Sequence, residues 1–187
     1  MNLPNILTIS RIFLVPVFII FLINHMSFHA LLIFIYAGIS DGLDGFIARY
    51  FNQKTLIGAY LDPLADKLLI TSSFICLAIL EIIPGWISVI VISRDILILS
   101  GIIILYMWDV PFEVKPSFVS KCTTTIQLVT VFLVLVNVTL TQHFLQHFII
   151  YCYVLTAGFS IISGFHYTYK GLNLLQAYTE ESGNNKR

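Results

Sequence analysis

Four aspartates lie at spacings that bring their carboxylates together. Asp41 and Asp44 are three residues apart, and Asp62 and Asp66 are four residues apart, so each pair shares one face of a helix. The short segment between the pairs predicts antiparallel neighbouring helices, on which the four carboxylates converge. Four unpaired carboxylates would repel one another and take up protons. Hard divalent cations resolve this repulsion with oxygen ligands, so the pattern predicts a site for two metal ions, Mg²⁺ or Mn²⁺.

Small residues and one arginine are interleaved with these aspartates. Gly42, Gly45, Ala48 and Gly58 either let a ligand approach the backbone or let the two helices pack closely. Arg49 is suited to a phosphate or pyrophosphate oxygen, or it anchors the helix at the membrane interface. The alternative for the aspartates is a set of surface salt bridges near the lipid headgroups. Four carboxylates at these spacings favour a functional site instead.

The composition indicates that the elements carrying these residues lie in a membrane. The chain has 187 residues, of which 58% are hydrophobic and 11% are charged, and its mean hydropathy is +0.91. Soluble domains have about 25% charged residues, so a water-soluble globule and a disordered chain are both excluded. The formal net charge of zero gives no electrostatic footprint for nucleic acid. The three cysteines lie in apolar runs without CxxC spacing, which predicts buried thiols.

About 20 apolar residues cross a bilayer as a helix, and six stretches fit this length. We expect crossings at residues 5–23, 29–50, 55–80, 84–107, 118–140 and 144–170. The first stretch follows no basic segment and precedes no cleavage site, so we expect a retained helix rather than a signal peptide. The predicted fold is an all-α integral membrane bundle of six transmembrane helices. It forms one domain, residues 1–172, followed by a polar tail, residues 173–187.

The distribution of Lys and Arg predicts the orientation in the membrane. The connections near residues 24–29, 81–85 and 141–147 contain neither. The basic residues near helix ends fall at the opposite side: Arg49, Lys54, Lys115, Lys121, Lys170, Lys186 and Arg187. By the positive-inside rule both termini are cytoplasmic, and so is the face that carries the four aspartates.

The segments DGLDGFIAR (residues 41–49) and GAYLDPLAD (58–66) are separated by eight residues. Together they resemble the signature of the CDP-alcohol phosphatidyltransferase family, DxxDGxxARx8GxxxDxxxD, and every fixed position is filled. PNILTISR (4–11) and SKCTTTIQ (120–127) are similar to the branch that contains phosphatidylglycerophosphate synthases and CMP-forming cardiolipin synthases. The resemblance extends from Pro4 to about Lys170.

The resemblance implies a homodimer of six-helix subunits in which an acceptor hydroxyl displaces CMP from CDP-diacylglycerol. Two metals would neutralise the pyrophosphate. On this sequence, Asp66 is the expected general base, and the four aspartates are the expected metal ligands or their neighbours. The implied donor site consists of Asn5, Thr8, Arg11, Gly45, Ala48, Arg49 and Gly58.

The acceptor needs its own site, and four cations lie in or beside the expected third, fourth and fifth helices: Lys67, Arg94, Lys115 and Lys121. They predict a pocket for an anionic glycerol-type acceptor, although Asp95 offers simple charge compensation for Arg94. Glycerol 3-phosphate would give phosphatidylglycerophosphate, and phosphatidylglycerol would give cardiolipin. We favour glycerol 3-phosphate, and inositol phosphate is a further alternative. The expected location is the inner membrane of a bacterium, with the active site at its cytoplasmic face.

A different class, a cation transporter or channel, also uses aspartates inside a membrane. Here the aspartates are confined to one end of the bilayer, and no inverted repeat is visible, which favours an enzyme. His143 and His147 are spaced i, i+4 and could hold a metal, but we interpret them as ordinary interfacial polar residues.

Overall fold

The computed structural model describes residues 3–50, 56–108, 117–140 and 143–184. For residues 3–7, 43–50, 56–63, 143–145, 177 and 179–184 it describes the backbone alone. These residues form six α-helices: α1 (Leu3–Ile23), α2 (Ser27–Tyr50), α3 (Leu56–Ile79), α4 (Gly85–Met107), α5 (Phe118–Leu140) and α6 (His143–Asn184). The bounds of α1 to α5 agree with the predicted crossings within a few residues. Only α6 differs clearly, because it continues without a break past the predicted boundary at residue 172.

Two sharp turns on one side of the fold reverse the direction of the chain. After α1, His25 has a φ of 57°, and after α3, Glu81 has a φ of 58°, which is the left-handed conformation typical of a helix C-terminal cap. The next residue in each turn donates its N–H to a carbonyl of the last helical turn. Met26 donates to Phe21 and Ile82 donates to Leu77, both at 2.9 Å. These bonds satisfy carbonyls that the helix end would otherwise leave unpaired.

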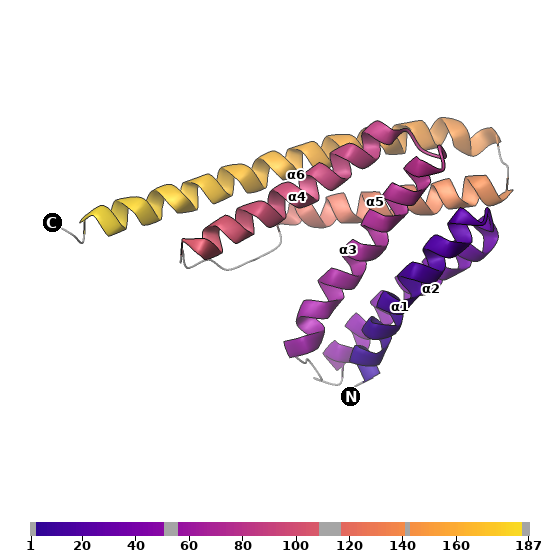
Figure 1. Ribbon diagram of the computed structural model, residues 1–187, viewed down its shortest axis with the longest axis horizontal. Helices are drawn as coiled ribbons and strands as arrows, with labels where there is room; N and C mark the ends of the chain where they lie inside the picture. Colours follow the sequence, from indigo (N-terminus) through magenta and orange to yellow (C-terminus); the bar gives the residue numbers. More distant parts are fainter. Residues whose placement is uncertain (1–2, 51–55, 109–116, 141–142, 185–187) are drawn as a thin grey trace.

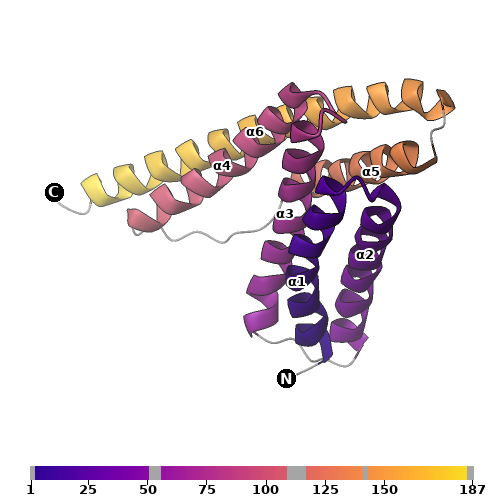
Figure 2. The same ribbon diagram turned by 45° about the vertical axis from the view of Figure 1, so that its right-hand side comes forward.

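The first three helices pack around α1. This helix contacts both α2 and α3, and Figure 2 shows it between them. Among the described residues, α2 and α3 do not pack against each other to a comparable extent. The expectation that the short connection would make α2 and α3 direct neighbours is therefore wrong. A helix from earlier in the chain supplies the apolar surface on which both of them are buried.

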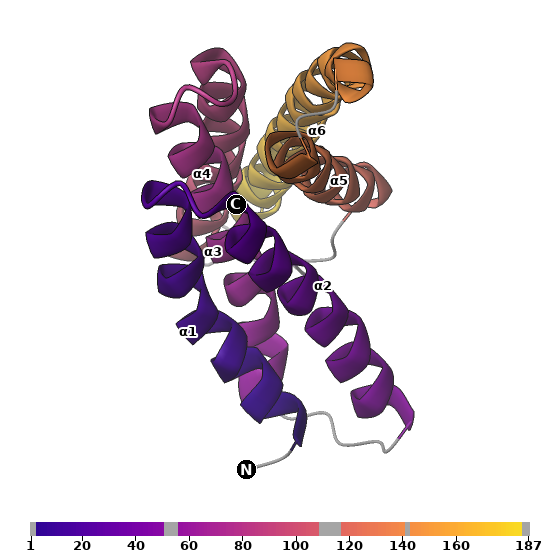
Figure 3. The same cartoon turned by 90° about the vertical axis from the view of Figure 1, so that its right-hand side faces the viewer.

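The six helices form two groups of three rather than a single bundle of parallel helices. In Figure 1, α1, α2 and α3 run together in one direction, and α4, α5 and α6 run at a steep angle to them. Figure 3 shows the same divergence from the side. The groups meet where the apolar core lies, which includes Phe18, Phe34, Phe74, Ile87 and Leu135. The polar ends of α1, α2 and α3 point away from this junction.

Apolar surface covers much of the outside of the molecule. Within the described residues, three segments are long and apolar enough to cross a membrane, Gly85–Met107, Phe118–Leu140 and Gln146–Gln176. Thr8–Ile23 and Ser27–Gly42 are shorter apolar helices. Large apolar side chains such as Phe13, Phe118 and Phe165 are more than 70% exposed, which suits contact with lipid rather than water. The chain is therefore a membrane protein.

Candidate active site

The first polar cluster lies within the α1–α3 group and is centred on Arg11 of α1. The Arg11 guanidinium donates from Nη1 to Oδ1 of Asp41 on α2 at 2.9 Å, and from the same nitrogen to Oδ1 of Asp66 on α3 at 2.6 Å. Arg11 is fully buried, whereas the side chains of Asp41 and Asp66 remain 44% and 37% exposed. The two carboxylates thus cover a buried cation and present part of their surface outward.

The three residues lie at the same level of the fold. The start of α1, the end of α2 and the start of α3 lie together at one end of the molecule (Figure 1). From the helix bounds, Arg11, Asp41 and Asp66 are each about 12–15 Å from that end, at 1.5 Å per residue. Apolar packing of α1 against both neighbours therefore brings the two predicted carboxylates together, and this part of the sequence prediction is confirmed.

The described carboxylates fit a divalent cation. Their oxygens are the hard ligands that Mg²⁺ and Mn²⁺ prefer, and both reach one nitrogen from different helices. The side chains of Asp44 and Asp62 lie outside the described residues. Among the side chains that are described, no group of three or more His, Cys, Asp or Glu could hold a metal ion. The two-metal site stays a prediction that depends on Asp44 and Asp62.

Most of the predicted donor site cannot be compared with the structure. The side chains of Asn5, Gly45, Ala48, Arg49 and Gly58 all lie outside the described residues. Thr8 is buried on α1, one turn before Arg11.

The neighbourhood of Asp41 contains open space. A Cβ atom added to Gly42, the residue after Asp41, would meet no heavy atom within 4 Å. Close helix packing around the described residues therefore does not explain this glycine, and the same holds for Gly38, one turn earlier.

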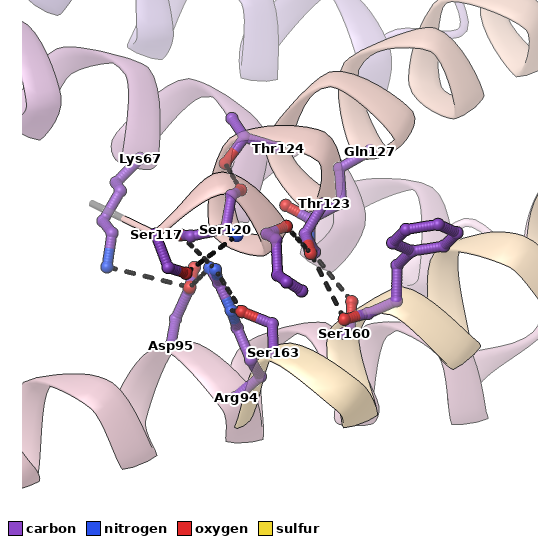
Figure 4. A network of polar contacts seen from close by, with 12 residues as sticks. Lys67, Arg94, Asp95, Ser117, Ser120, Thr123, Thr124, Gln127, Ser160 and Ser163 are labelled. Atoms are coloured by element: carbon purple, nitrogen blue, oxygen red, sulfur yellow. Dashed lines mark hydrogen bonds and ion pairs between the residues drawn. The ribbon is translucent and has the colours of Figure 1, made fainter. Parts of the chain in front are cut away.

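The second polar cluster is centred on Arg94 of α4 (Figure 4). Arg94 Nη1 donates to Oδ1 of Asp95 at 2.6 Å, and Nη2 donates to the hydroxyls of Ser120 on α5 and Ser163 on α6, at 2.7 and 3.0 Å. On the other side of Asp95, the ammonium of Lys67 on α3 lies 3.7 Å from the same carboxylate oxygen. Arg94 is only 5% exposed, so its guanidinium serves mainly to join three helices.

The structure brings two of the four predicted acceptor cations together. Lys67 and Arg94 meet at Asp95, and the charge compensation by Asp95 that the sequence offered as an alternative is present. Lys67 is 49% exposed and retains access to a ligand. Lys121 is exposed on α5, next to Ser120, and Lys115 lies outside the described residues.

A row of hydrogen bonds joins α5 to α6 and extends the second cluster. The amide of Gln127 donates to the Ser160 hydroxyl at 3.2 Å, and the hydroxyls of Thr130 and Thr156 lie 2.8 Å apart. The Thr123 hydroxyl donates to the carbonyl of Phe159 at 3.2 Å. Sequence reasoning missed this role. The signal was available, because polar residues recur on α5 at the three- to four-residue spacing of one helix face.

Comparison with known proteins agrees with the motif in α2 and α3. The sequence profile of the CDP-alcohol phosphatidyltransferase family matches residues 1–159. A CMP-forming cardiolipin synthase of Rattus norvegicus is 37% identical over 147 residues, covering 70% of this chain and 48% of that protein. A CDP-diacylglycerol–glycerol-3-phosphate 3-phosphatidyltransferase of Wigglesworthia glossinidia brevipalpis is 38% identical over 143 residues, covering 71% and 75%.

The chain matches only part of some relatives. It spans about half of the rat protein, and 24% of a cardiolipin synthase (CMP-forming) / mitochondrial hydrolase fusion protein of Schizosaccharomyces pombe, to which it is 37% identical over 142 residues and 68% of its own length. The matched part of the chain contains both aspartate pairs and Arg11. The profile match and the identity to relatives of both activities lead to one conclusion: the chain belongs to the CDP-alcohol phosphatidyltransferase family.

Proposed function

We propose that the protein transfers the phosphatidyl group of CDP-diacylglycerol to glycerol 3-phosphate, forming phosphatidylglycerophosphate and releasing CMP. The observation that carries this proposal is the meeting of Asp41 and Asp66 at Arg11, with the half-exposed Lys67 next to Asp66 in the chain. A carboxylate that can bind a metal cation and an ammonium that can bind a phosphate are thereby carried by consecutive residues of α3. Phosphoryl transfer needs both kinds of group.

In this reaction the acceptor hydroxyl attacks the β-phosphorus of the donor. The bond between that phosphorus and the oxygen that joins it to the CMP phosphate breaks, and CMP leaves with the electron pair. Asp66, as general base, accepts the hydroxyl proton. Asp41, Asp44, Asp62 and Asp66 would hold two divalent cations, Mg²⁺ or Mn²⁺. When bound, these ions supply charge neutralisation at the pyrophosphate and at the leaving group.

The donor nucleotide binds along the first three helices. The proposed site includes Thr8, which is buried on α1, and the uncrowded position of Gly42 beside Asp41 is compatible with a ligand there. The remaining residues of the proposed donor site are Asn5, Gly45, Ala48, Arg49 and Gly58.

The acceptor phosphate is held by Lys67, with Lys115 and Lys121 adding positive charge. Arg94 contributes mainly by supporting Asp95, which positions the Lys67 ammonium. In this proposal the acceptor spans one turn of α3, with its phosphate near Lys67 on the α4 side and its hydroxyl near Asp66, which faces α1 and α2.

Phosphatidylglycerol is the second candidate acceptor, and it would give cardiolipin. Relatives of both activities have similar identity to this chain. The described acceptor cluster also allows it, because two cations and one carboxylate leave a single net positive charge. One positive charge matches the single negative charge of the phosphodiester in phosphatidylglycerol, whereas the phosphate monoester of glycerol 3-phosphate carries nearly two and would also need Lys115 or Lys121.

Product identification decides between these reactions. The purified protein is given CDP-diacylglycerol and Mn²⁺ with glycerol 3-phosphate, phosphatidylglycerol or inositol phosphate in separate tubes, and CMP and the lipid product are measured. CMP release with glycerol 3-phosphate alone supports the proposal. Release with phosphatidylglycerol alone identifies a cardiolipin synthase. Cation flux into vesicles without CMP release from any acceptor would support a transporter and overturn both.

The proposal includes an arrangement in the membrane. All six helices cross it, both termini are cytoplasmic, and the two helix groups tilt to opposite sides of the membrane normal. Residues 1–172 form the catalytic domain, residues 173–187 follow as a tail, and two chains form a homodimer. The active site faces the cytoplasm at the inner membrane of a bacterium. The common level of Arg11, Asp41 and Asp66 near one end of α1–α3 supports a site at one membrane face.

A further inference from the structure

Two carboxylates from different helices depend on one nitrogen of Arg11. Asp41 belongs to α2 and Asp66 to α3, and both bond to Nη1 of Arg11 on α1. Because α2 and α3 have little direct packing in the described part of the chain, the relative position of these carboxylates is set through α1. Arg11 is the side chain that makes this connection.

The burial pattern shows from which side Arg11 acts. Its guanidinium has no exposed surface, while both carboxylates are more than one-third exposed. A ligand that approaches from the open side therefore meets Asp41 and Asp66 before it meets Arg11. This geometry is poor for a residue that binds the nucleotide directly, and good for one that supports the carboxylates from beneath.

The positive charge of Arg11 also offsets the negative charges of Asp41 and Asp66. A buried guanidinium is costly unless it is paired, and two carboxylates held close together repel each other unless a cation lies between them. The bonds from Arg11 to Asp41 and Asp66 serve both requirements. A cation that is part of the chain is present whether or not a metal ion is bound.

We propose that Arg11 is a positioning residue, an internal cation that keeps Asp41 and Asp66 at the spacing needed for metal binding and offsets their charge when no metal is present. The inference rests on the proposed function for the identity of the metal site. It replaces the donor-binding role that the family resemblance implied for Arg11. The metal then adds to a site whose carboxylates are already assembled.

The test measures thermal unfolding of the purified protein in EDTA and in saturating MnCl2, with Mn²⁺ binding followed by electron paramagnetic resonance. Arg11→Gln should lower the melting temperature in EDTA by about 6 °C or more, as expected for breaking a buried ion pair. Added Mn²⁺ should raise the melting temperature of Arg11→Gln more than that of the unmodified protein, because the metal replaces the lost charge. Arg11→Lys keeps the charge, so its melting temperature in EDTA should lie between those of Arg11→Gln and the unmodified protein.

Thr8→Val is the matched control, since Thr8 is buried on the same helix one turn earlier. It should leave the Mn²⁺-dependent gain unchanged and raise KM for CDP-diacylglycerol. If Arg11→Gln behaves in the same way as Thr8→Val, Arg11 binds the donor and the inference is wrong. An equal Mn²⁺-dependent gain in Arg11→Gln and the unmodified protein would also overturn it.

A second arm separates this inference from the proposed function. Asp41→Asn is combined with Arg11→Gln, and stability is measured in EDTA alone. If Arg11 offsets the carboxylate charge, the double variant should be more stable than the sum of the two single effects predicts. Additive losses would contradict the inference. If instead the unmodified protein gains no stability from Mn²⁺ and the cycle is still non-additive, the proposed metal site fails while the role of Arg11 stands.

Discussion

Asp66 and Lys67 are consecutive on α3, yet they contact different helices. Asp66 faces Arg11 of α1, and Lys67 faces Asp95 of α4. Successive residues of a helix are about 100° apart around its axis, so one turn of α3 presents an acid to one side and a cation to the other. In the proposed reaction this turn joins the donor half of the site to the acceptor half.

Removing the charge of a single site aspartate should abolish transfer without unfolding the protein. We expect Asp62→Asn and Asp66→Asn to lose at least about 100-fold in kcat, because each removes a metal ligand or the general base. CMP release is measured alongside circular dichroism. Glu81→Gln, the same kind of change on an exposed residue in the turn after α3, should retain full activity. Full activity of Asp62→Asn would rule out the metal site.

Gly42 allows a test of the open space beside Asp41. An added Cβ meets nothing within 4 Å at Gly42 or at Gly38, one turn earlier. Both Gly→Ala changes should therefore stabilise α2, by about 0.5–1 kcal/mol. Only Gly42→Ala should raise KM for CDP-diacylglycerol, because its methyl group enters the space of the ligand. Equal kinetics for the two variants would show that no ligand occupies this position.

At the scale of the elements, α4, α5 and α6 are joined by polar side chains inside an apolar group. Arg94 bonds to Ser120 and Ser163, and Gln127 bonds to Ser160. Between apolar helices in lipid, where the hydrophobic effect does little to drive association, such hydrogen bonds and close packing determine how the helices meet.

Arg94→Gln should therefore act on stability before it acts on catalysis. Loss of the buried guanidinium leaves Asp95 with Lys67 alone, which we expect to cost about 3 kcal/mol. Lys67→Gln removes an exposed cation and should instead raise KM for the acceptor with little effect on the melting temperature. Unfolding curves and acceptor titrations on both variants check this. An Arg94→Gln variant of unchanged stability with a raised acceptor KM would show that Arg94 binds the acceptor directly.

The helices themselves were predictable from the sequence, but their neighbours were not. Apolar stretches and helix breakers such as Pro84, which precedes α4, indicate where α1 to α5 begin and end. Both signals are local properties of the sequence. The pairing of α2 with α3 was inferred from their short connection, and α1 takes that place instead. Loop length limits which helices can meet, but the packing of side chains from distant helices decides which of them do.

The same distinction applies to the site. Spacing alone indicated that Asp41 shares a helix face with Asp44 and that Asp66 shares one with Asp62, because these positions follow from helical geometry. The bond from Arg11 to both carboxylates depends on the packing of α1. Only a three-dimensional arrangement contains that information.

Both helix groups present apolar surface, as expected for a molecule that crosses a membrane. The proposed topology can be tested by cysteine labelling. In a variant without its three cysteines, a cysteine at His25 should react with a membrane-impermeant thiol reagent in intact cells. A cysteine at Asn52 should react only after the cells are opened. Labelling of both positions from the same side would contradict six crossings. Removal of the partly exposed Cys122 lowers the labelling background, and because Cys76 and Cys152 are buried, the variant should be tested first for retained folding.

The length of α6 has a practical consequence for imaging. Its 42 residues make a helix of about 60 Å, roughly twice the thickness of the hydrocarbon core. The first part of α6 packs against α4 and α5, and the helix then continues beyond them. A helical partner fused in register with α6 would therefore have a fixed orientation relative to the protein. A rigid helical fusion partner joined to this helix would give electron cryomicroscopy a fixed feature outside the detergent micelle, by which images of a protein of only 21.2 kDa could be aligned.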